Sequence, residues 1–276
     1  MWQVRAVVFA PNEVEELKEI TEEAMGLFDS AQQARLLRYY RKEDTFRSLM
    51  GRLLPQLLLK EQGIARAAMK FGVTRAGKPY MARLPEAIGY SITHDNGVVG
   101  MAFASGPDLN PDPPDYKVGV DVMKLHLPKR HNFRGFVEVF TEQLTAEELA
   151  VLLPSPGISE EEGLSRFYSI WALKEAYSKA IGIGLGLEFK RISYDVVNRT
   201  VRIDGVVPAG WEFTRFELTI DVPTGTESYV GFAVRYAPDL VQRPGRVLHA
   251  EQPSEWLQIT HARDFLRQAL DEFKVD

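Results

Sequence analysis

Apolar residues recur along the chain with two different periods, and each period predicts one kind of element. In the segment 46–58 they are spaced as on one side of a helix: Phe46, Leu49, Met50, Leu53, Leu54, Leu57 and Leu58. We therefore expect an amphipathic helix that is kinked at Pro55 and ends at Gly63. A second strong helix is expected over 165–182, with an apolar stripe formed by Ile170, Leu173, Tyr177, Ala180 and Ile181.

Short stretches rich in β-branched and aromatic residues predict strands, among them "WQVRAVVF", "KVGVDVMK", "FELTIDV" and "SYVGFAVRYA". The stretch "YSITHDNGVVGMAFA" predicts a hairpin that turns at Asn96 and Gly97. A long helix followed by strands occurs twice, and the stretches "GVVGMAFA" and "YVGFAVRY" are alike. This order predicts two related halves that each combine a long helix with strands.

The stretch "PDLNPDPPDY" (residues 107–116) is the clearest linker in the chain. We therefore expect an N-terminal half over 1–116, a C-terminal half over 117–240 and an extension over 241–276. The extension lacks strong patterning except for a final helix around "EWLQITHARDFLRQALDEF", and its role is open. Within the C-terminal half, Thr145 precedes Glu148 by three residues, the spacing of a capping box.

The composition excludes several classes of protein. The 276 residues include no cysteine, so disulfides, thiolate metal sites and cysteine nucleophiles are excluded. No uncharged apolar run approaches the ~20 residues of a membrane span. The start "MWQVRAVVFA" is too short and too interrupted by polar residues for a signal peptide. We expect a soluble, cytoplasmic protein that does not bind membranes.

Charge is unevenly distributed although the net charge is only −5. The segment 35–83 carries twelve Lys and Arg against three Asp and Glu, while the flanking segments are acidic. One interpretation is a solvated basic face, and the other is a local site for an anion. Nucleic acid is disfavoured because aromatic residues are not interleaved with the basic ones and the protein is acidic overall.

Two acidic residues are candidates for metal chemistry. Glu175 and Lys179 lie one helical turn apart on the face that carries Trp171, just before the Gly-rich turn "GIGLG". Such a pair is ordinarily a surface ion pair worth ~0.2–0.5 kcal/mol, which is the alternative to a functional role. Asp121 lies in an apolar strand, where a carboxylate is costly unless it is paired, bound to a metal or exposed at an edge. If Asp121 and Glu175 converge, their oxygens suit Mg²⁺.

A phosphate site is suggested by "GVTRAGKP" (residues 72–79), which matches a nucleotide-binding loop except for its last position. Pro79 stands where Ser or Thr would bind the metal, so the match is accidental. The turn Gly77-Lys78-Pro79 still offers a cation and backbone amides to a phosphate. His94 follows at a strand end, and the absence of a G-x-S-x-G elbow argues against a serine hydrolase.

Taken in order, "MGRLL", "AGKPY", "SITHDN", "VGVDVMK" and "FYSIWALKEAYSKAIGIGLGLEF" resemble the 4′-phosphopantetheinyl transferase superfamily. The resemblance is to the larger, two-halved type and covers roughly residues 1–237. It implies an α+β fold in which two similar halves, each a long helix on a small and mainly antiparallel sheet, are related by a pseudo-twofold axis. It also implies a cleft between the halves for coenzyme A, and Mg²⁺-dependent transfer of phosphopantetheine to a serine of a carrier protein, with release of 3′,5′-ADP.

The resemblance also implies roles for individual residues. Asp121 and Glu175 match the Mg²⁺ ligands, and Glu175 matches the base that acts directly or through water. Together with Lys179, which matches a lysine on the transferring phosphate, they form the expected catalytic set. Met123 replaces a second acid of many bacterial relatives, so we expect water as the third metal ligand. The residues expected to contact coenzyme A are Arg35, Arg75, Gly77, Lys78, Pro79, Thr93, His94, Lys174 and Lys179.

Two other hypotheses remain open from the sequence. The first is a non-catalytic module that binds coenzyme A or a carrier protein, and the complete set of Asp121, Glu175 and Lys179 argues against it. The second is a nucleotide kinase or NTPase, which only the incomplete loop favours. We expect a monomer, because two halves within one chain complete a cleft between them. The carrier proteins that the enzyme modifies are not predicted.

Overall fold

The structure is a computed structural model that describes residues 2–75, 77–82, 84, 88–105, 110–111, 114–115, 117–154, 156–237, 245, 247–250 and 255–274. Its helices are α1 (Glu13–Glu16), α2 (Lys18–Met25), α3 (Ser30–Leu36), α4 (Lys42–Glu61), α5 (Phe133–Val139), α6 (Ala146–Leu152), α7 (Glu160–Ile181) and α8 (Ala262–Lys274). Within these residues, none of the helices combines the length and apolar character that a membrane crossing requires.

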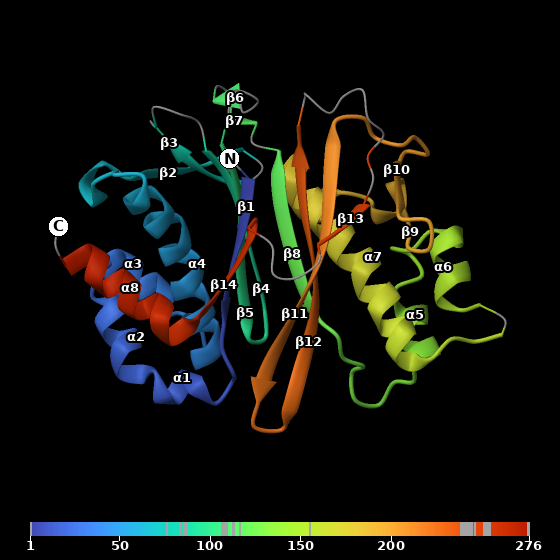
Figure 1. The fold of residues 1–276 in the computed structure, drawn as a ribbon, viewed down its shortest axis with the longest axis horizontal. Helices are drawn as coiled ribbons and strands as arrows, with labels where there is room; N and C mark the ends of the chain where they lie inside the picture. Colours follow the sequence, from blue (N-terminus) through green and yellow to red (C-terminus); the bar gives the residue numbers. More distant parts are fainter. Residues whose placement is uncertain are drawn as a thin grey trace.

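The strands form two main sheets that lie between two groups of helices (Figure 1). Those before residue 116 are β1 (Trp2–Val8), β2 (Lys70–Val73), β3 (Pro79–Ala82), β4 (Ile88–Asp95), β5 (Val98–Ser105), β6 (Asn110–Pro111) and β7 (Pro114–Asp115). Those after it are β8 (Val118–Lys124), β9 (Ile192–Asp195), β10 (Thr200–Ile203), β11 (Trp211–Val222), β12 (Gly225–Tyr236), β13 (Val247–His249) and β14 (Leu257–His261).

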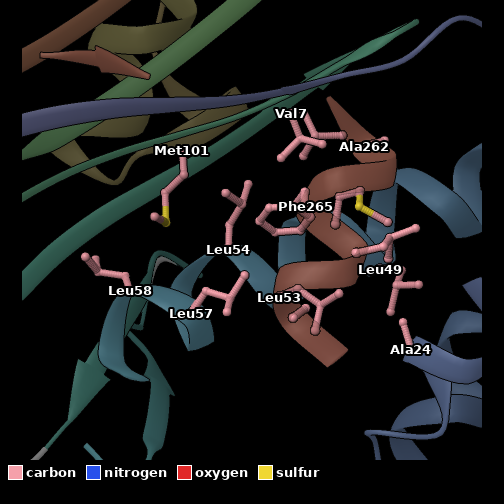
Figure 2. Packing of buried hydrophobic residues seen from close by; sticks show 14 of the residues in the cluster. Val7, Ala24, Leu49, Leu53, Leu54, Leu57, Leu58, Met101, Ala262 and Phe265 are labelled. Atoms are coloured by element: carbon pink, nitrogen blue, oxygen red, sulfur yellow. The ribbon is translucent and has the colours of Figure 1, made fainter. Parts of the chain in front are cut away.

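The N-terminal half is a sheet in the order β14-β1-β5-β4-β3-β2, covered on one face by α4. β4 and β5 form the expected hairpin, and Asn96 adopts the left-handed φ of 45° that its turn requires. The apolar residues of α4 are buried as expected, with Leu49 and Leu53 fully inaccessible. Figure 2 shows Leu49 and Leu53 beside Phe265 of α8, and Leu54 between Phe265 and Met101 of β5.

The C-terminal half repeats this plan with the sheet β13-β11-β12-β8 and the long helix α7. Ser159 caps the start of α7, and Gly182 ends it with a left-handed φ of 74°. The predicted capping box is confirmed, since the Thr145 and Glu148 side chains each accept the other residue's backbone N–H. The molecule is therefore an α+β protein of two similar halves.

The two sheets pack directly on each other through their faces that are not covered by helices. This contact is an apolar cluster to which both halves contribute: Val4, Ala6, Val98, Ala102, Val118, Val120, Val122, Phe216, Leu218, Ile220, Tyr229, Ala233 and Leu257. The resulting order of layers is helices, sheet, sheet, helices (Figure 1). A buried apolar contact of this kind holds the halves in one fixed arrangement.

The C-terminal segment 247–274 contacts both halves. β13 pairs in parallel with β11, and Trp256 then packs its ring against Phe216 of the C-terminal half. The chain next enters the N-terminal half, where β14 pairs in parallel with β1. It ends in α8, which packs against α2 and α4. The segment whose role the sequence left open therefore completes the N-terminal core.

Candidate active site

Asp121 lies on the face of β8 that points toward α7, and its neighbours Val120 and Val122 pack against the other half. Its Oδ1 accepts a hydrogen bond from the Thr93 hydroxyl at 2.9 Å and from the Lys179 ammonium at 2.7 Å. Its Oδ2 is buried and has no hydrogen-bond partner among the described residues. Burial raises the pKa of the Asp121 carboxyl, and the Lys179 charge opposes this shift. The carboxyl is thus only half satisfied, which is uncommon for a buried acid.

Glu175 and Lys179 lie one turn apart on α7, as the sequence predicted, and both are partly exposed. Lys179 also donates to the carbonyl oxygen of Val120 at 3.2 Å, so its ammonium lies against β8. Burial raises the pKa of the Glu175 carboxyl, and the negative charge of Asp121 raises it further. The negative charge of each acid therefore disfavours ionisation of the other, as expected for two carboxyls that face the same strand–helix contact.

The close approach of α7 to β8 depends on Gly119. A Cβ atom at this position would lie only 1.9 Å from the carbonyl oxygen of Ala176 and 2.6 Å from the amide nitrogen of Ala180. Any side chain at Gly119 would therefore push the helix away from the strand. The glycine two residues before Asp121 thus fixes how far Glu175 and Lys179 lie from that carboxyl.

The donor set around Asp121 fits a magnesium ion. Asp121 and Glu175 supply hard oxygen ligands, and the unpartnered Oδ2 of Asp121 is the kind of atom that a cation would satisfy. The described residues contain no group of three or more acidic or histidine side chains placed to hold a metal. Mg²⁺ matches this pattern because it binds through one or two carboxylates and takes its other ligands from water and phosphates.

A groove with a volume of about 640 Å³ opens in the N-terminal half, on the side of β4 that faces α4. Its walls are formed by α3, α4, β2, β3 and β4: Phe28, Gln32, Arg35, Tyr39, Arg47, Ser48, Gly51, Arg52, Pro55, Gln56, Phe71, Gly72, Val73, Pro79, Tyr90, Ile92 and His94. Three arginines and several aromatic rings thus line one cavity, a combination suited to a ligand with phosphates and a flat ring.

His94 lies at the end of this groove that adjoins β8. The surrounding protein lowers the pKa of its imidazole, and so do the positive charges of Arg47 and Lys179. Both effects favour the neutral imidazole. Because Thr93, the residue before His94 on β4, donates to Asp121, the end of the groove and the carboxyl cluster adjoin each other.

Comparison with known proteins identifies the family. The family model described as 4′-phosphopantetheinyl transferase superfamily matches residues 117–223, and the one described as 4′-phosphopantetheinyl transferase, N-terminal, matches residues 16–105. The 4′-phosphopantetheinyl transferase pptA of Paxillus involutus is 45% identical over 219 residues, which are 77% of this chain and 80% of that protein. The chain belongs to the 4′-phosphopantetheinyl transferase superfamily.

More distant members of the family show the same similarity. The L-aminoadipate-semialdehyde dehydrogenase-phosphopantetheinyl transferase of Mus musculus is 28% identical over 63% of this chain, and the match spans 54% of the mouse protein. The 4′-phosphopantetheinyl transferase ffp of Bacillus subtilis is 29% identical over 64% of this chain and 70% of its own. This chain is therefore a transferase enzyme of the two-part type.

Lys78 of this transferase holds the two halves together. Its ammonium donates to the carbonyl oxygens of Val118, Lys179 and Ala180 at 2.7, 2.8 and 2.6 Å, so it caps the end of α7. We expected this side chain to contact coenzyme A, whereas the structure directs it into the fold. In the same turn Pro79 lines the groove, while Gly77, at a left-handed φ of 88°, and Arg75 are exposed.

Two residues expected to contact coenzyme A are directed away from the groove of the transferase. Lys174 is fully buried, and its ammonium bonds Glu148 at 2.6 Å and the carbonyl oxygen of Gln143 at 2.8 Å. The expectation that Lys174 contacts coenzyme A is therefore wrong, because its ammonium is bonded inside the core of the C-terminal half. Thr93 is 4% exposed and points to Asp121, so it too differs from the expectation.

Sequence reasoning missed Arg47 and Arg52, which line the groove of this transferase together with the expected Arg35. Arg52 is notable because its buried Nε has no hydrogen-bond partner among the described residues. Both arginines lie in the basic segment 35–83 and near Gly51, which also lines the groove. Neither arginine is one of the apolar residues of α4 that are assigned to the core. Their place on the same helix, among those residues, was the signal available in the sequence.

Proposed function

We propose that this transferase moves 4′-phosphopantetheine from coenzyme A to a serine of apo acyl or peptidyl carrier proteins. The reaction would require Mg²⁺ and release 3′,5′-ADP. The observation that carries the proposal is the adjacency of the Asp121, Glu175 and Lys179 cluster to a groove lined by arginines. Since both parts lie in one chain, we propose that the enzyme acts as a monomer.

Coenzyme A would lie in the groove with its phosphates at the cationic residues. Arg35, Arg47 and Arg52 supply charge-assisted hydrogen bonds to the phosphates of the nucleotide. The apolar and aromatic wall beside Pro79, including Phe71 and Tyr90, offers a surface on which an adenine ring can pack. Gly77 and Arg75 are proposed contacts on the adjoining turn. His94 and Lys179 would hold the diphosphate at the end of the groove.

Asp121 and Glu175 would hold the magnesium ion, which supplies positive charge to the diphosphate. The serine oxygen of the carrier attacks the phosphorus next to pantetheine, and the bond from that phosphorus to the oxygen of 3′,5′-ADP breaks. Glu175 would take the serine proton, directly or through a water molecule, and its raised pKa makes it a better base. Lys179 would neutralise the charge that develops on the transferring phosphate.

The test is to incubate the protein with an apo carrier protein, coenzyme A and Mg²⁺ and to measure the intact mass of the carrier. The proposal expects the carrier to gain one phosphopantetheine group in an amount that grows with time. Binding of coenzyme A without this gain would instead support a module that binds its ligand but does not catalyse. An array of apo carriers from fatty-acid, polyketide, nonribosomal-peptide and lysine pathways would identify the substrates.

The groove predicts a specific effect of Arg52. Replacing Arg52 by Gln should raise the KM for coenzyme A by about 10- to 150-fold, because a charged hydrogen bond to a phosphate is worth ~1.5–3 kcal/mol. The value of kcat should change little, since Arg52 is proposed to bind the nucleotide and not the transferring phosphate. Steady-state kinetics with varied coenzyme A measures both constants.

The matched control for Arg52 is Arg38→Gln. Arg38 is exposed, belongs to the same basic segment and does not line the groove. Its replacement removes one positive charge without removing a contact to the ligand. An equal rise of KM in both variants would indicate a general effect of charge and would contradict the proposed contact.

A further inference from the structure

The strand β4 presents different side chains on its two faces. Ile92 and His94 face the groove. Ser91, Thr93 and Asp95 alternate with them and face β8 of the other half, as the period of two in a strand requires. One strand therefore carries both a wall of the groove and a row of short polar side chains, which we call the β4–β8 seam (Ser91, Thr93 and Asp95).

Each residue of the β4–β8 seam is bonded to β8. The Ser91 hydroxyl oxygen accepts the amide of Val120 at 3.3 Å, and the Asp95 carboxylate accepts the amide of Lys124 at 2.7 Å. Between them, the Thr93 hydroxyl donates to Oδ1 of Asp121 at 2.9 Å. The outer two bonds hold backbone atoms, so they fix the register of the strands. The central bond alone reaches a carboxyl of the proposed metal site.

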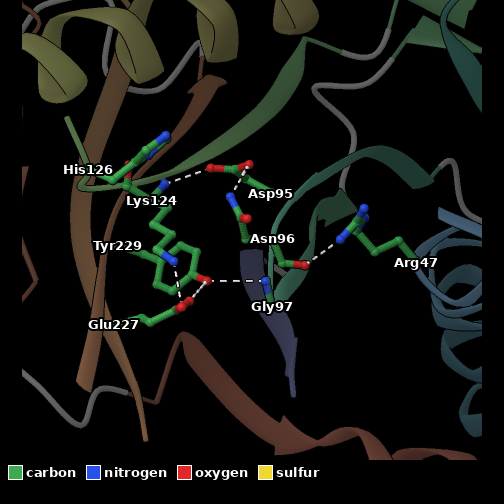
Figure 3. Close-up of polar contacts among 8 residues, drawn as sticks. All are labelled: Arg47, Asp95, Asn96, Gly97, Lys124, His126, Glu227 and Tyr229. Atoms are coloured by element: carbon green, nitrogen blue, oxygen red, sulfur yellow. Dashed lines mark hydrogen bonds and ion pairs between the residues drawn. The ribbon is translucent and has the colours of Figure 1, made fainter. Parts of the chain in front are cut away.

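Hydrogen bonds and an ion pair also hold the Asp95 end of the β4–β8 seam, from the C-terminal sheet and from α4 (Figure 3). Lys124 forms an ion pair with Glu227, which also accepts a hydrogen bond from the Tyr229 hydroxyl at 2.8 Å. The amide of Gly97 donates to that hydroxyl at 3.1 Å. From the groove side, Arg47 donates to the carbonyl oxygen of Asn96 at 2.8 Å. The turn after Thr93 is thus tied to α4 and to the C-terminal sheet.

From this arrangement we infer that Thr93 is a positioning residue, whose hydroxyl sets the orientation of the Asp121 carboxyl for metal binding. Thr93 and Asp121 are 4% and 5% exposed, so their hydrogen bond is shielded from water. Thr93 and Lys179 both occupy Oδ1, which leaves Oδ2 as the oxygen without a partner. The hydroxyl thereby selects which carboxyl oxygen is available to a cation, a role typical of outer-shell partners of metal ligands.

This inference rests on the proposed magnesium role of Asp121, and Thr93→Val tests it because valine keeps the shape and removes the hydroxyl. We expect the Mg²⁺ concentration for half-maximal rate to rise by about 10- to 100-fold, as for other outer-shell partners. The KM for coenzyme A should stay within about twofold, and Thr93→Ser should restore Mg²⁺ affinity. The affinity for Mn²⁺ in the presence of 3′,5′-ADP should fall together with the affinity for Mg²⁺. Mn²⁺ binding is measured by the decrease of the EPR signal of the free ion.

The matched control is Thr214→Val, which removes a buried hydroxyl from β11, a strand separated from β8 by β12. It should leave Mn²⁺ binding unchanged. A raised KM for coenzyme A with unchanged Mn²⁺ binding in Thr93→Val would show a ligand contact and overturn the inference. So would equal Mn²⁺ binding in Thr93→Val and the wild type. If Thr93→Val does not fold, Thr93→Cys, whose thiol is a weak donor, takes its place with the same criteria.

Asp121→Asn separates this inference from the proposed function. If the wild type and Asp121→Asn bind Mn²⁺ equally well, the magnesium role of Asp121 fails, whatever Thr93 does. If Asp121→Asn loses Mn²⁺ binding and Thr93→Val keeps it, the metal site stands and only the role of Thr93 fails. The inference is supported when both variants lose affinity and Thr93→Ser regains it.

Discussion

Replacing Glu175 by Gln should lower the rate of phosphopantetheine transfer by about 10³-fold, within the range expected when a catalytic acid–base group is removed. Glutamine keeps the size of the side chain but cannot take a proton from the carrier serine, and its neutral oxygen is a weaker ligand for a cation. The rate should be measured from the mass of the carrier under single-turnover conditions, so that chemistry rather than product release is observed.

The same substitution should not destabilise the protein. The pKa of Glu175 is raised in the folded state, mainly by burial and to a smaller extent by the charge of Asp121. A carboxyl with a raised folded pKa lowers stability once the pH exceeds its unfolded value, because the folded state resists ionisation. Glutamine removes this effect, so the metal-free variant should melt at the same or a higher temperature than the wild type at pH 7. Thermal unfolding with EDTA present measures this.

The pH dependence of the wild type provides a further check on Glu175. If Glu175 is the base, kcat/KM at low Mg²⁺ concentration falls as the pH decreases through the pKa of Glu175 in the free enzyme, which burial and the charge of Asp121 raise above the ordinary 4.5. The control is Glu161→Gln, which changes an exposed acid on the same helix and should leave the rate unaltered. A Glu175→Gln enzyme with a rate near that of the wild type would contradict both the base and the metal assignment.

The long helices, the facing of Asp121 on its strand and the one-turn spacing of Glu175 and Lys179 could be predicted because their signals are local. The apolar spacing of α4 and α7 determines which face is buried. The alternation in β8 separates Asp121 from Val120 and Val122, and the one-turn spacing places Glu175 beside Lys179. These relations depend on positions within one element, and the structure has them as expected.

The contacts between distant elements could not be predicted, because the sequence of one element does not show which other element packs against it. The amphipathic pattern of α8 predicts a helix, but nothing in it indicates that the partner is α4, some two hundred residues away. The roles of Thr93 and Lys78 likewise follow from the meeting of the two halves. Lys174 is a different case, since it lies at helical spacing from Ile170, Tyr177 and Ile181 and could have been assigned to the buried side.

Removing the C-terminal segment should unfold the N-terminal half. Six side chains of α8 are buried against α2 and α4: Ala262, Phe265, Leu266, Ala269, Leu270 and Phe273. Deleting one buried leucine costs about 2–5 kcal/mol, and a whole domain is stable by only about 5–15 kcal/mol. A chain that ends at Ala237 also loses β14 and so exposes the edge of β1. We expect this chain to lack a cooperative thermal transition and to fail to bind coenzyme A.

A milder variant tests the same contact in the full-length protein. Leu266 is fully buried, and Leu266→Ala should lower the free energy of unfolding by about 2–5 kcal/mol in urea titrations. The matched control is Gln268→Ala on the exposed side of α8, which should change it by less than about 0.5 kcal/mol. Because α8 supports α4, and α4 carries Arg47 and Arg52, loss of stability should be accompanied by weaker binding of coenzyme A.

A truncated chain that melts like the full-length protein would show that the N-terminal core is complete without α8.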